Sequence, residues 1–341
     1  MASHAPGEPG TASGASPRAR LEQAWDACLP SRVRVVEVGP RDGLQNLDRF
    51  VPTNVKIALI NRLARLGFDR IEAVSFVHPR AVPQMRDAEA IMDSVERGHA
   101  RLIGLVPNAH GTRRALACGM DGLNFVVSAS ERFNQTNLRQ PIAESMASLA
   151  ESIALASAAG VPMRLTISTA FGCPYEGFVD PEAVLAIAEA GAELGCHEIC
   201  LGDTTGMANP RQVFHLFRDL RDRIGSAEPA VHLHNTRGSG AANLVAALQA
   251  GVTVFDASIG GLGGCPYAPG ATGNVCTEDM VHMLQEMGIE TGIDLAALID
   301  TARRVEHNLG VDLPGQVMRA GIACALSSLP ESNALDPSPA G

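Results

Sequence analysis

Residues 230–258 read AVHLHNTRGSGAANLVAALQAGVTVFDAS and contain the pattern that decides the fold. The apolar run at 230–234 predicts a strand, 239–250 has the spacing of a helix, and VTVFDAS at 252–258 predicts a second strand. A strand, a helix and a further strand in this order are typical of a parallel βαβ unit. The sequence here therefore predicts an α/β protein.

The same alternation runs through the chain from residue 33 onward. Eight strand–helix units over roughly 250 residues have the size and order of a TIM (β/α)8 barrel. A doubly wound open sheet is the alternative, but its phosphate-binding fingerprint is absent, because GGLGGCP (260–266) has proline at the third glycine position and follows the last strand. We expect strands at 33–39, 70–76, 101–106, 122–129, 163–169, 197–202, 230–234 and 252–258, and helices near 53–66, 83–97, 110–118, 141–159, 180–194, 210–223, 239–250 and 276–287.

The ends of the chain differ from this repeating part. Residues 1–30 are rich in Gly, Ala, Ser and Pro without periodicity, which predicts a disordered tail. Two helical patterns, 294–308 and 314–326, follow the last strand–helix unit. We therefore predict a barrel domain at 31–290, extra C-terminal helices packed on it at 291–328, and a second tail at 329–341.

Composition excludes several classes of protein. A net charge of −10 and a pI near 5.5 offer no basic stripe for nucleic acid, and the sequence has no apolar run long enough to span a membrane. Eight cysteines without a CxxC spacing indicate reduced thiols, and the N-terminus lacks the apolar core of a secretory signal, so we expect a cytoplasmic protein. Lys56 is the only lysine and falls in a helix pattern, which excludes most Schiff-base chemistry.

His232 and His234 suggest a metal site. Side chains alternate along a strand, so both imidazoles project from one face. Two core histidines bonded to backbone carbonyls are the plainer interpretation, and for one histidine it would be preferred. For an H-x-H pair at a strand end metal ligation is favoured, provided that oxygen ligands lie at other strand ends. Asp42 follows the first strand and Asn274 lies in the loop after the eighth, and these strand ends adjoin the seventh when a barrel closes. The set suits Mg²⁺ or Mn²⁺ better than tetrahedral zinc, with Fe²⁺ possible on the ligands alone.

Other polar residues follow or interrupt the predicted strands. Glu72 is a carboxylate inside an apolar run, where it needs a partner, and Arg41 on the neighbouring strand end can supply one. Asp203 follows strand six, where it could instead cap the next helix. Cys265 lies in a glycine-rich loop, and Cys173 in a second CPY triplet competes with it for any thiol role. Ser75 ends strand two, and Gln45 lies after strand one. Asn137 and Arg139 lie in the loop after strand four, where a surface role is favoured for each residue taken singly.

Five motifs resemble those of the 3-hydroxy-3-methylglutaryl-CoA lyases, a family within the metal-dependent barrel lyases and Claisen synthases. They are EVGPRDGLQN (37–46), EAVSFV (72–77), LGDTTG (201–206), HLHNTRG (232–238) and SIGGLGGCPYAPGATGN (258–274). The resemblance covers residues 31–310, and the GLGGCPY loop separates the lyases from the synthases, which lack that cysteine.

The resemblance implies specific roles. The ion, Mg²⁺ or Mn²⁺, is bound by Asp42, His232, His234 and Asn274. Arg41 polarises the thioester carbonyl, Cys265 is a loop thiol needed for turnover, and Glu72, Asp203 and His232 complete the catalytic set. The implied substrate contacts are Arg41, Gln45, Ser75, Asn137 and Arg139.

The resemblance also implies an activity and an assembly. The substrate is an acyl-CoA, 3-hydroxy-3-methylglutaryl-CoA, cleaved to acetoacetate and acetyl-CoA, and the protein forms a homodimer. The chain differs from the family pattern at Asp48, Arg139, Asn235 and Arg237. These differences leave open a lyase for citramalyl-CoA or a longer 3-alkyl analogue. A barrel that binds acyl-CoA without turnover and a Claisen synthase are weaker alternatives.

Overall fold

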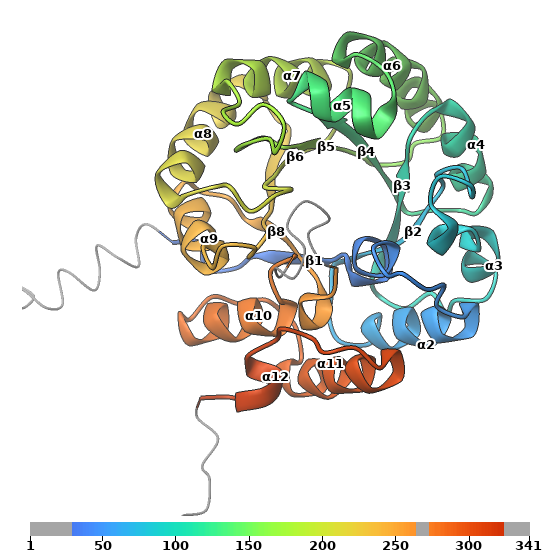
Figure 1. Ribbon diagram of the computed structural model, residues 1–341, viewed down its shortest axis with the longest axis vertical. Coiled ribbons are helices and arrows are strands. Elements are labelled where there is room, and N and C mark those ends of the chain that lie inside the picture. The colour runs from blue at the N-terminus through green and yellow to red at the C-terminus, as the bar shows by residue number, and fades with distance from the viewer. Residues whose placement is uncertain (1–28, 264–272, 324–341) are drawn as a thin grey trace, which may run out of the picture.

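The computed structural model describes residues 29–263 and 273–323. Eight parallel strands form a closed barrel in chain order, with β1 hydrogen-bonded to β8, and a ring of helices surrounds them (Figure 1). The predicted TIM barrel is confirmed, and the open sheet is excluded. The strands are β1 (Arg34–Glu37), β2 (Arg70–Ser75), β3 (Arg101–Val106), β4 (Gly122–Ser128), β5 (Met163–Ser168), β6 (Glu198–Gly202), β7 (Glu228–His232) and β8 (Val254–Ala257).

The helices follow the predicted alternation with four local differences. The segment expected as one helix near 83–97 forms a short turn and a short helix, and three further elements, η1, α5 and η3, were not predicted. The helical elements are η1 (Gly39–Gly43), α2 (Thr53–Leu63), η2 (Pro83–Met85), α3 (Ala88–Met92), α4 (Ala109–Ala117), α5 (Glu131–Leu138), α6 (Ile142–Ala158), α7 (Pro181–Glu193), α8 (Pro210–Arg223), α9 (Gly240–Gln249), η3 (Ile259–Gly261), α10 (Thr277–Glu286), α11 (Leu295–Leu309) and α12 (Val317–Ala320).

Capping explains why α5 exists without an apolar period. The helix buries only Phe133 and Asn134, so its sequence carries no amphipathic signal. It begins because the Ser130 hydroxyl accepts a hydrogen bond from the Phe133 N–H at 3.1 Å. It ends at Arg139, which adopts a left-handed conformation with φ of 60°. Local hydrogen bonding therefore forms a helix that the hydrophobic pattern could not predict.

The core has two parts. A large apolar cluster fills the space between the strands and the helices, and a small one lies apart from it on the strands. The smaller cluster consists of Val36, Val38, Ile103, Cys200, Ala230 and Val254. Charged strand residues are also buried, so charge pairing has to complete the packing of the barrel.

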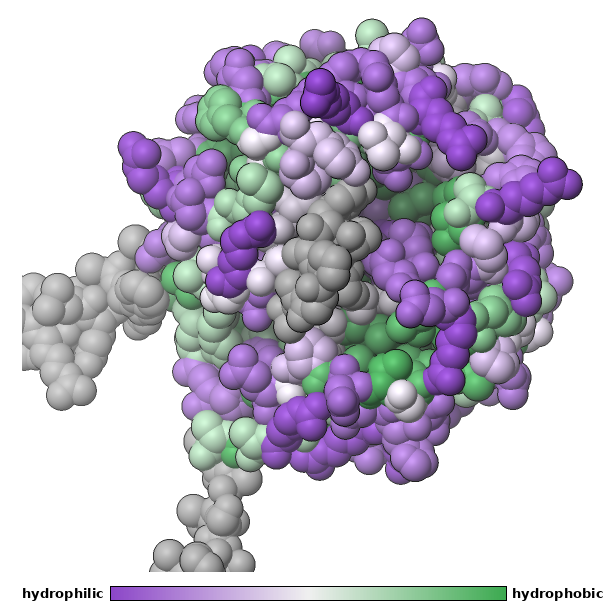
Figure 2. Space-filling view, in the orientation of Figure 1, coloured by the Kyte–Doolittle hydropathy of each residue, from purple (hydrophilic) through white to green (hydrophobic). Residues whose placement is uncertain are grey.

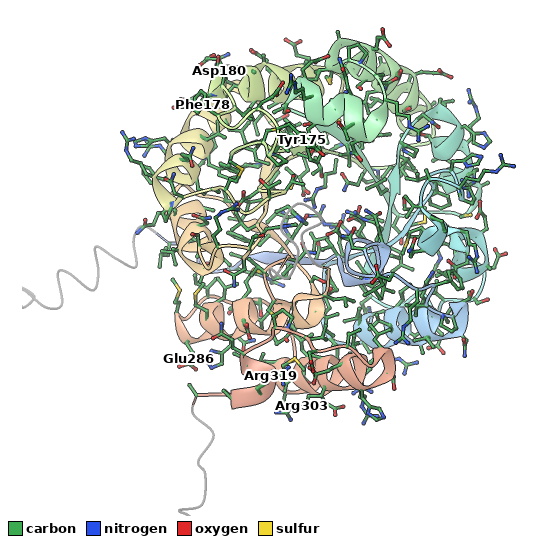
Figure 3. The ribbon with its side chains drawn as sticks, in the orientation of Figure 1. Tyr175, Phe178, Asp180, Glu286, Arg303 and Arg319 are labelled. Carbon is green, nitrogen blue, oxygen red and sulfur yellow. The ribbon has the colours of Figure 1, made fainter. Side chains whose placement is uncertain are left out.

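The predicted helix 294–308 corresponds to α11, whereas the predicted helix 314–326 is too long, because only 317–320 are helical as α12 and 324–326 lie outside the described residues. Helix α11 contacts α2, α10 and η3, and α12 is tied to α11 by two hydrogen bonds. Arg303 donates from Nε to the Met318 carbonyl at 2.6 Å, and Arg319 pairs with Glu306 at 2.8 Å (Figure 3). No helix in the described ranges is long and apolar enough to cross a membrane. The boundary at 290 stays a prediction, and the predicted tails lie outside the described residues except for 29 and 30.

Glu37 joins the end of β1 to the elements that follow β8. Its Oε1 accepts hydrogen bonds from the N–H groups of Gly39 and Ile259 at 2.7 and 2.9 Å, and its Oε2 accepts one from the Thr277 hydroxyl at 2.7 Å. A Cβ on Gly39 would lie 2.7 Å from that carboxylate oxygen, so this close approach requires glycine. Burial raises the pKa of Glu37 to about 8, which keeps the carboxyl group protonated near neutral pH.

We predict that Glu37→Gln flattens the dependence of thermal stability on pH. A carboxyl group with a raised folded-state pKa stabilises the fold fully below its unfolded value, 4.5, and loses this contribution as pH rises through about 8. Glutamine stays neutral and presents the same oxygen to the two N–H groups. The wild-type Tm should therefore fall relative to that of the variant between about pH 5 and about pH 8. Parallel curves would contradict the assignment, and Glu193→Gln, at an exposed position of α7, is the control.

Candidate active site

The turn η1 presents Arg41 and Asp42 at the carboxyl end of β1. Arg41 is only 8% exposed and donates from Nη1 to Asp42 Oδ1 and from Nη2 to Glu72 Oε2, both at 2.6 Å. The other oxygen of Glu72 accepts a hydrogen bond from Asn124 Nδ2 at 2.9 Å. The predicted pairing of Glu72 with Arg41 is confirmed, and it fixes the guanidinium beside Asp42.

His232 and His234 converge at the end of β7. Their Nε2 atoms lie 3.2 Å apart, so both rings project from one face of the chain as predicted. His232 Nδ1 lies 3.2 Å from Asp256 Oδ2 on β8. The two Nε2 atoms are therefore directed at a common point.

Asn274 reaches the same point from the loop after β8. The backbone of 273–275 pairs antiparallel with 233–235, through Asn235 N–H to the Gly273 carbonyl at 2.7 Å and Val275 N–H to the Leu233 carbonyl at 3.1 Å. This pairing places Asn274 so that its Nδ2 donates to Asp42 Oδ2 at 2.8 Å. The structure thus brings together all four predicted ligands.

The chemistry of these donors fits a divalent ion. Ligand atoms of Asp42, His232 and His234 all lie within 4.8 Å of one another. Burial alone would raise the pKa of Asp42, but Arg41 and His232 hold it well below its usual range, so the group is a carboxylate. Burial, with His232 next to it, lowers the pKa of His234 to about 3, which leaves a neutral imidazole. The buried Oδ1 of Asn274 has no hydrogen-bond partner among the described residues. A carboxylate, a neutral imidazole and an unpartnered amide oxygen are suitable ligands.

Asp203 lies beside this cluster. Its N–H donates to the His232 carbonyl at 2.8 Å, and its Oδ1 accepts from the N–H groups of Met207 and Ala208 at 2.8 and 3.0 Å. Asn209 caps α8, so the alternative that Asp203 caps this helix is wrong. Its Oδ2 is buried without a hydrogen-bond partner in the described part of the chain. Burial raises the pKa of Asp203 to about 6, a value suited to a group that exchanges protons.

The predicted substrate contacts other than Arg41 differ in exposure. Gln45 is half-buried after η1, and Ser75 is buried with its hydroxyl accepting from the Val77 N–H at 3.4 Å. Asn137 and Arg139 are exposed on and after α5. Figure 2 shows that the rim of this face is mainly hydrophilic, with apolar residues visible inside it next to α2. The roles of these outer residues stay predictions.

Of the two candidate thiols, Cys265 and Cys173, the structure describes only Cys173. Cys265 lies outside the described residues. Cys173 is fully buried after β5 and accepts a hydrogen bond from the Ser130 hydroxyl at 2.9 Å. Tyr175 of the same triplet lies beside α5 (Figure 3), with its ring centroid 6.1 Å from that of Phe133. Cys173 therefore has a packed structural environment.

Sequence reasoning missed Asp256 and Arg164. Arg164 donates from Nη2 to Asp256 Oδ2 at 2.6 Å, and both residues are buried within apolar strand runs. The argument that marked Glu72, a charge inside a β run that needs a partner, applies equally to MRLTIST (163–169) and VTVFDAS (252–258).

Known proteins share this sequence and fold. The HMGL-like family model matches residues 32–305. Hydroxymethylglutaryl-CoA lyase of Bacillus subtilis is 44% identical over 84% of this chain and 96% of that protein. The (R)-citramalyl-CoA lyase of Chloroflexus aurantiacus is 43% identical over 85% of this chain and 95% of its own length. A structure of an HMG-CoA lyase from Acinetobacter baumannii with coenzyme A and 3-methylmalate has a TM-score of 0.84 at 44% identity, covering 88% of this chain and 98% of that one.

The fold and the site define a TIM-barrel enzyme with a cluster suited to a divalent metal at the carboxyl ends of its strands. The resemblance noted in the sequence is confirmed by the family model and by relatives that match most of the chain. The chain belongs to the HMGL-like family, and the two relatives above are named hydroxymethylglutaryl-CoA lyase and (R)-citramalyl-CoA lyase.

We predict that Glu72→Gln destabilises the protein by about 3 kcal/mol. This is the lower end of the range for removing one partner of a buried ion pair, because Asp42 still pairs with Arg41. Urea unfolding of wild type and variant measures the change. The control is Glu96→Gln, which removes an exposed pair with Arg65 and should cost less than about 1 kcal/mol. Equal losses in the two variants would contradict a structural role for the Glu72–Arg41 pair.

Proposed function

We propose that the protein cleaves 3-hydroxy-3-methylglutaryl-CoA to acetoacetate and acetyl-CoA with a bound Mg²⁺ or Mn²⁺. The observation that carries the proposal is the convergence of Asp42, His232 and His234 within 4.8 Å, next to the buried guanidinium of Arg41. The relatives named as hydroxymethylglutaryl-CoA lyases support the choice of substrate.

The reaction needs two sites of charge stabilisation. The 3-hydroxyl group loses its proton, its C–O bond becomes the ketone of acetoacetate, and the C2–C3 bond breaks. The electron pair of that bond moves to C2 and forms the enolate of acetyl-CoA, which then takes a proton at C2. A divalent ion held by Asp42, His232, His234 and Asn274 would supply Lewis-acid polarisation of substrate oxygens.

The protein's own residues supply the rest. Arg41 uses Nη1 and Nη2 for its carboxylate partners, and its buried Nε–H has no partner among the described residues, so this donor is left for the thioester oxygen on which enolate charge develops. The free Oδ2 of Asp203, with its raised pKa, can hold the proton that the hydroxyl group loses. Glu72 holds Arg41 in place. The family resemblance supports Cys265 as the thiol needed for turnover.

A lyase of the same mechanism for citramalyl-CoA is the second candidate. The Chloroflexus aurantiacus relative named for that activity is as similar to this chain as the hydroxymethylglutaryl-CoA lyases are. Two of the positions that differ from the family pattern have structural roles. Arg237 donates to the carbonyls of Thr205 and Gly206 at 2.7 and 3.1 Å, and Asn235 accepts from the Gly240 N–H at 3.0 Å. Asp48 and Arg139 are exposed, and they are the differences that could affect substrate choice.

We also propose an assembly, a location and a set of substrate contacts for this enzyme. A homodimer, a cytoplasmic location and the outer substrate contacts Gln45, Ser75, Asn137 and Arg139 rest on the family resemblance and on composition. The acyl-CoA substrate itself is supported by the named relatives and by the solved complex that contains coenzyme A.

The substrate test compares purified protein on a panel of 3-hydroxyacyl-CoA thioesters, with acetyl-CoA release as the measurement. We expect cleavage of 3-hydroxy-3-methylglutaryl-CoA, with acetoacetate as the second product. If kcat/KM for citramalyl-CoA or a longer 3-alkyl analogue is about a hundredfold higher, the preferred acid is a different one while the mechanism stands. Absence of acetyl-CoA release from every member of the panel would contradict the enzyme proposal.

The metal test uses chelator-treated protein titrated with Mn²⁺ and followed by calorimetry. We expect binding at one site per chain and recovery of activity with Mn²⁺ or Mg²⁺. His234→Ala should lower affinity by more than the roughly 10–100-fold that loss of an outer-shell partner causes, since it removes a ligand itself. His215→Ala, at an exposed position of α8, should bind as wild type does. Full activity after chelation would contradict the metal assignment.

A further inference from the structure

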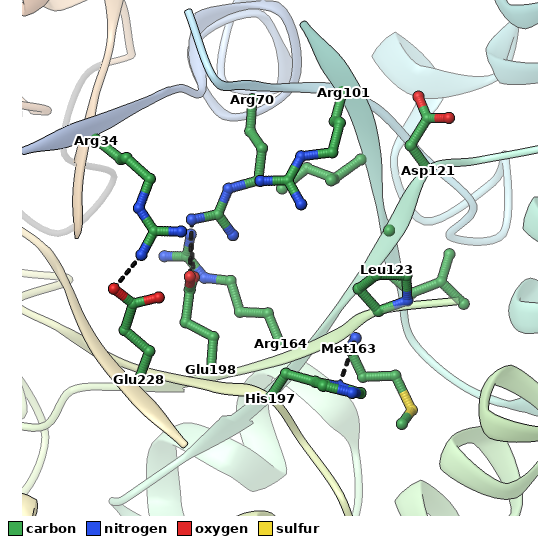
Figure 4. Close-up of a pocket in the computed structure, with 13 residues that line it drawn as sticks. Arg34, Arg70, Arg101, Asp121, Leu123, Met163, Arg164, His197, Glu198 and Glu228 are labelled. Atoms are coloured by element: carbon green, nitrogen blue, oxygen red, sulfur yellow. Dashed lines mark hydrogen bonds and ion pairs between the residues drawn. The ribbon is translucent and has the colours of Figure 1, made fainter. Parts of the chain in front are cut away.

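A connected set of ion pairs leads from the amino-terminal end of the barrel to the candidate metal site. Figure 4 shows its lower part, where Arg70, Arg164 and Glu198 meet. Arg70 donates from Nη2 to Glu198 Oε2 at 2.7 Å, and Arg164 Nη1 lies 3.2 Å from Glu198 Oε1. The other arm of the Arg164 guanidinium donates to Asp256 Oδ2 at 2.6 Å. Asp256 Oδ2 in turn lies 3.2 Å from His232 Nδ1.

Stability alone does not account for this arrangement. Each of the four charged residues is at most 8% exposed. Buried ion pairs seldom stabilise a protein more than apolar side chains of the same volume would. A set of charges retained inside the barrel therefore has to be explained by what it positions. Its upper end is a histidine of the candidate metal site.

The contact with Asp256 decides which nitrogen of His232 carries the hydrogen. A carboxylate accepts, so a neutral His232 ring has its proton on Nδ1 and its lone pair on Nε2. That lone pair is on the nitrogen that lies 3.2 Å from His234 Nε2, on the side of Asp42. His234 Nδ1 is buried with no hydrogen-bond partner in the described ranges. Of the two imidazoles, His232 is therefore the one whose orientation is fixed by a contact at Nδ1.

We propose that Asp256, held in place by Arg164, is a positioning residue that fixes His232 in the Nδ1–H tautomer and directs its Nε2 at the metal site. The expected effect on metal affinity rests on the proposed metal site. The contact between Asp256 and His232 is present in the protein without an ion. Asp256 does not contact the reacting groups. It acts through the orientation of His232.

The test is Asp256→Ala, studied by two measurements. Arg164 and His232 both contact Asp256 Oδ2, so an asparagine oxygen placed there would still accept from Nδ1–H, whereas alanine removes the acceptor and leaves Arg164 its ion pair with Glu198. Without an acceptor at Nδ1, the neutral ring adopts mainly the Nε2–H tautomer that free histidine prefers, and that proton blocks the lone pair. Long-range ¹H–¹⁵N spectra of the metal-free protein, at a pH where the ring is neutral, should show the Nδ1–H tautomer in wild type and the Nε2–H tautomer in the variant. Calorimetry with Mn²⁺ should show affinity reduced roughly 10–100-fold.

Two further variants make the outcomes decisive. Glu228 lies on β7, as His232 does, and pairs with Arg34 on β1. Glu228→Gln removes that ion pair and should change neither measurement. If Asp256→Ala does not fold, Arg164→Met with Asp256→Ala removes both charges together and carries the same expectation. An unchanged tautomer, or wild-type Mn²⁺ affinity in the variant, would overturn the inference. Failure of wild-type protein to bind Mn²⁺ would instead overturn the metal site, with the tautomer measurement still deciding the role of Asp256.

Discussion

Charged side chains inside the barrel have to pair with one another, and this constraint shapes the site. They are largely buried, so an unpaired arginine or carboxylate would carry a desolvation cost of several kcal/mol. Arg41 therefore binds both Asp42 and Glu72, and Glu72 uses its second oxygen for Asn124. The result is a guanidinium whose position is set from two directions before any substrate arrives. Such preorganisation reduces the reorganisation needed when charge develops in a reaction.

The metal cluster depends on how the barrel closes. Asp42 follows β1, the histidines end β7, and Asn274 comes from the segment after β8, so the four residues meet because β8 pairs with both β1 and β7. Glu37 reinforces this junction by binding N–H groups on both sides of it. The fold and the site are therefore stabilised by the same contacts.

The parts of the site that could be predicted from the sequence involve residues on one strand or on adjacent strands. Alternation along one strand placed His232 and His234 on one face, and the order of strands placed Arg41 beside Glu72. The Arg164–Asp256 pair joins β5 to β8, which do not adjoin in the sheet, so strand order alone could not predict it. The turn η1 and helix α5 were missed because GPRDG (39–43) and ERFNQTNL (131–138) carry no apolar period, and hydrogen bonds to backbone groups define them instead.

The pairing of 273–275 with 233–235 anchors Asn274 to the chain segment that carries His234. Asn274 is held by two backbone hydrogen bonds of its neighbours and by its own contacts with Asp42 and the Leu262 carbonyl. Asn274 is therefore tied through its backbone to the end of β7 and through its side chain to η1. A residue that comes after the last strand is in this way held by the barrel as firmly as one that lies on a strand.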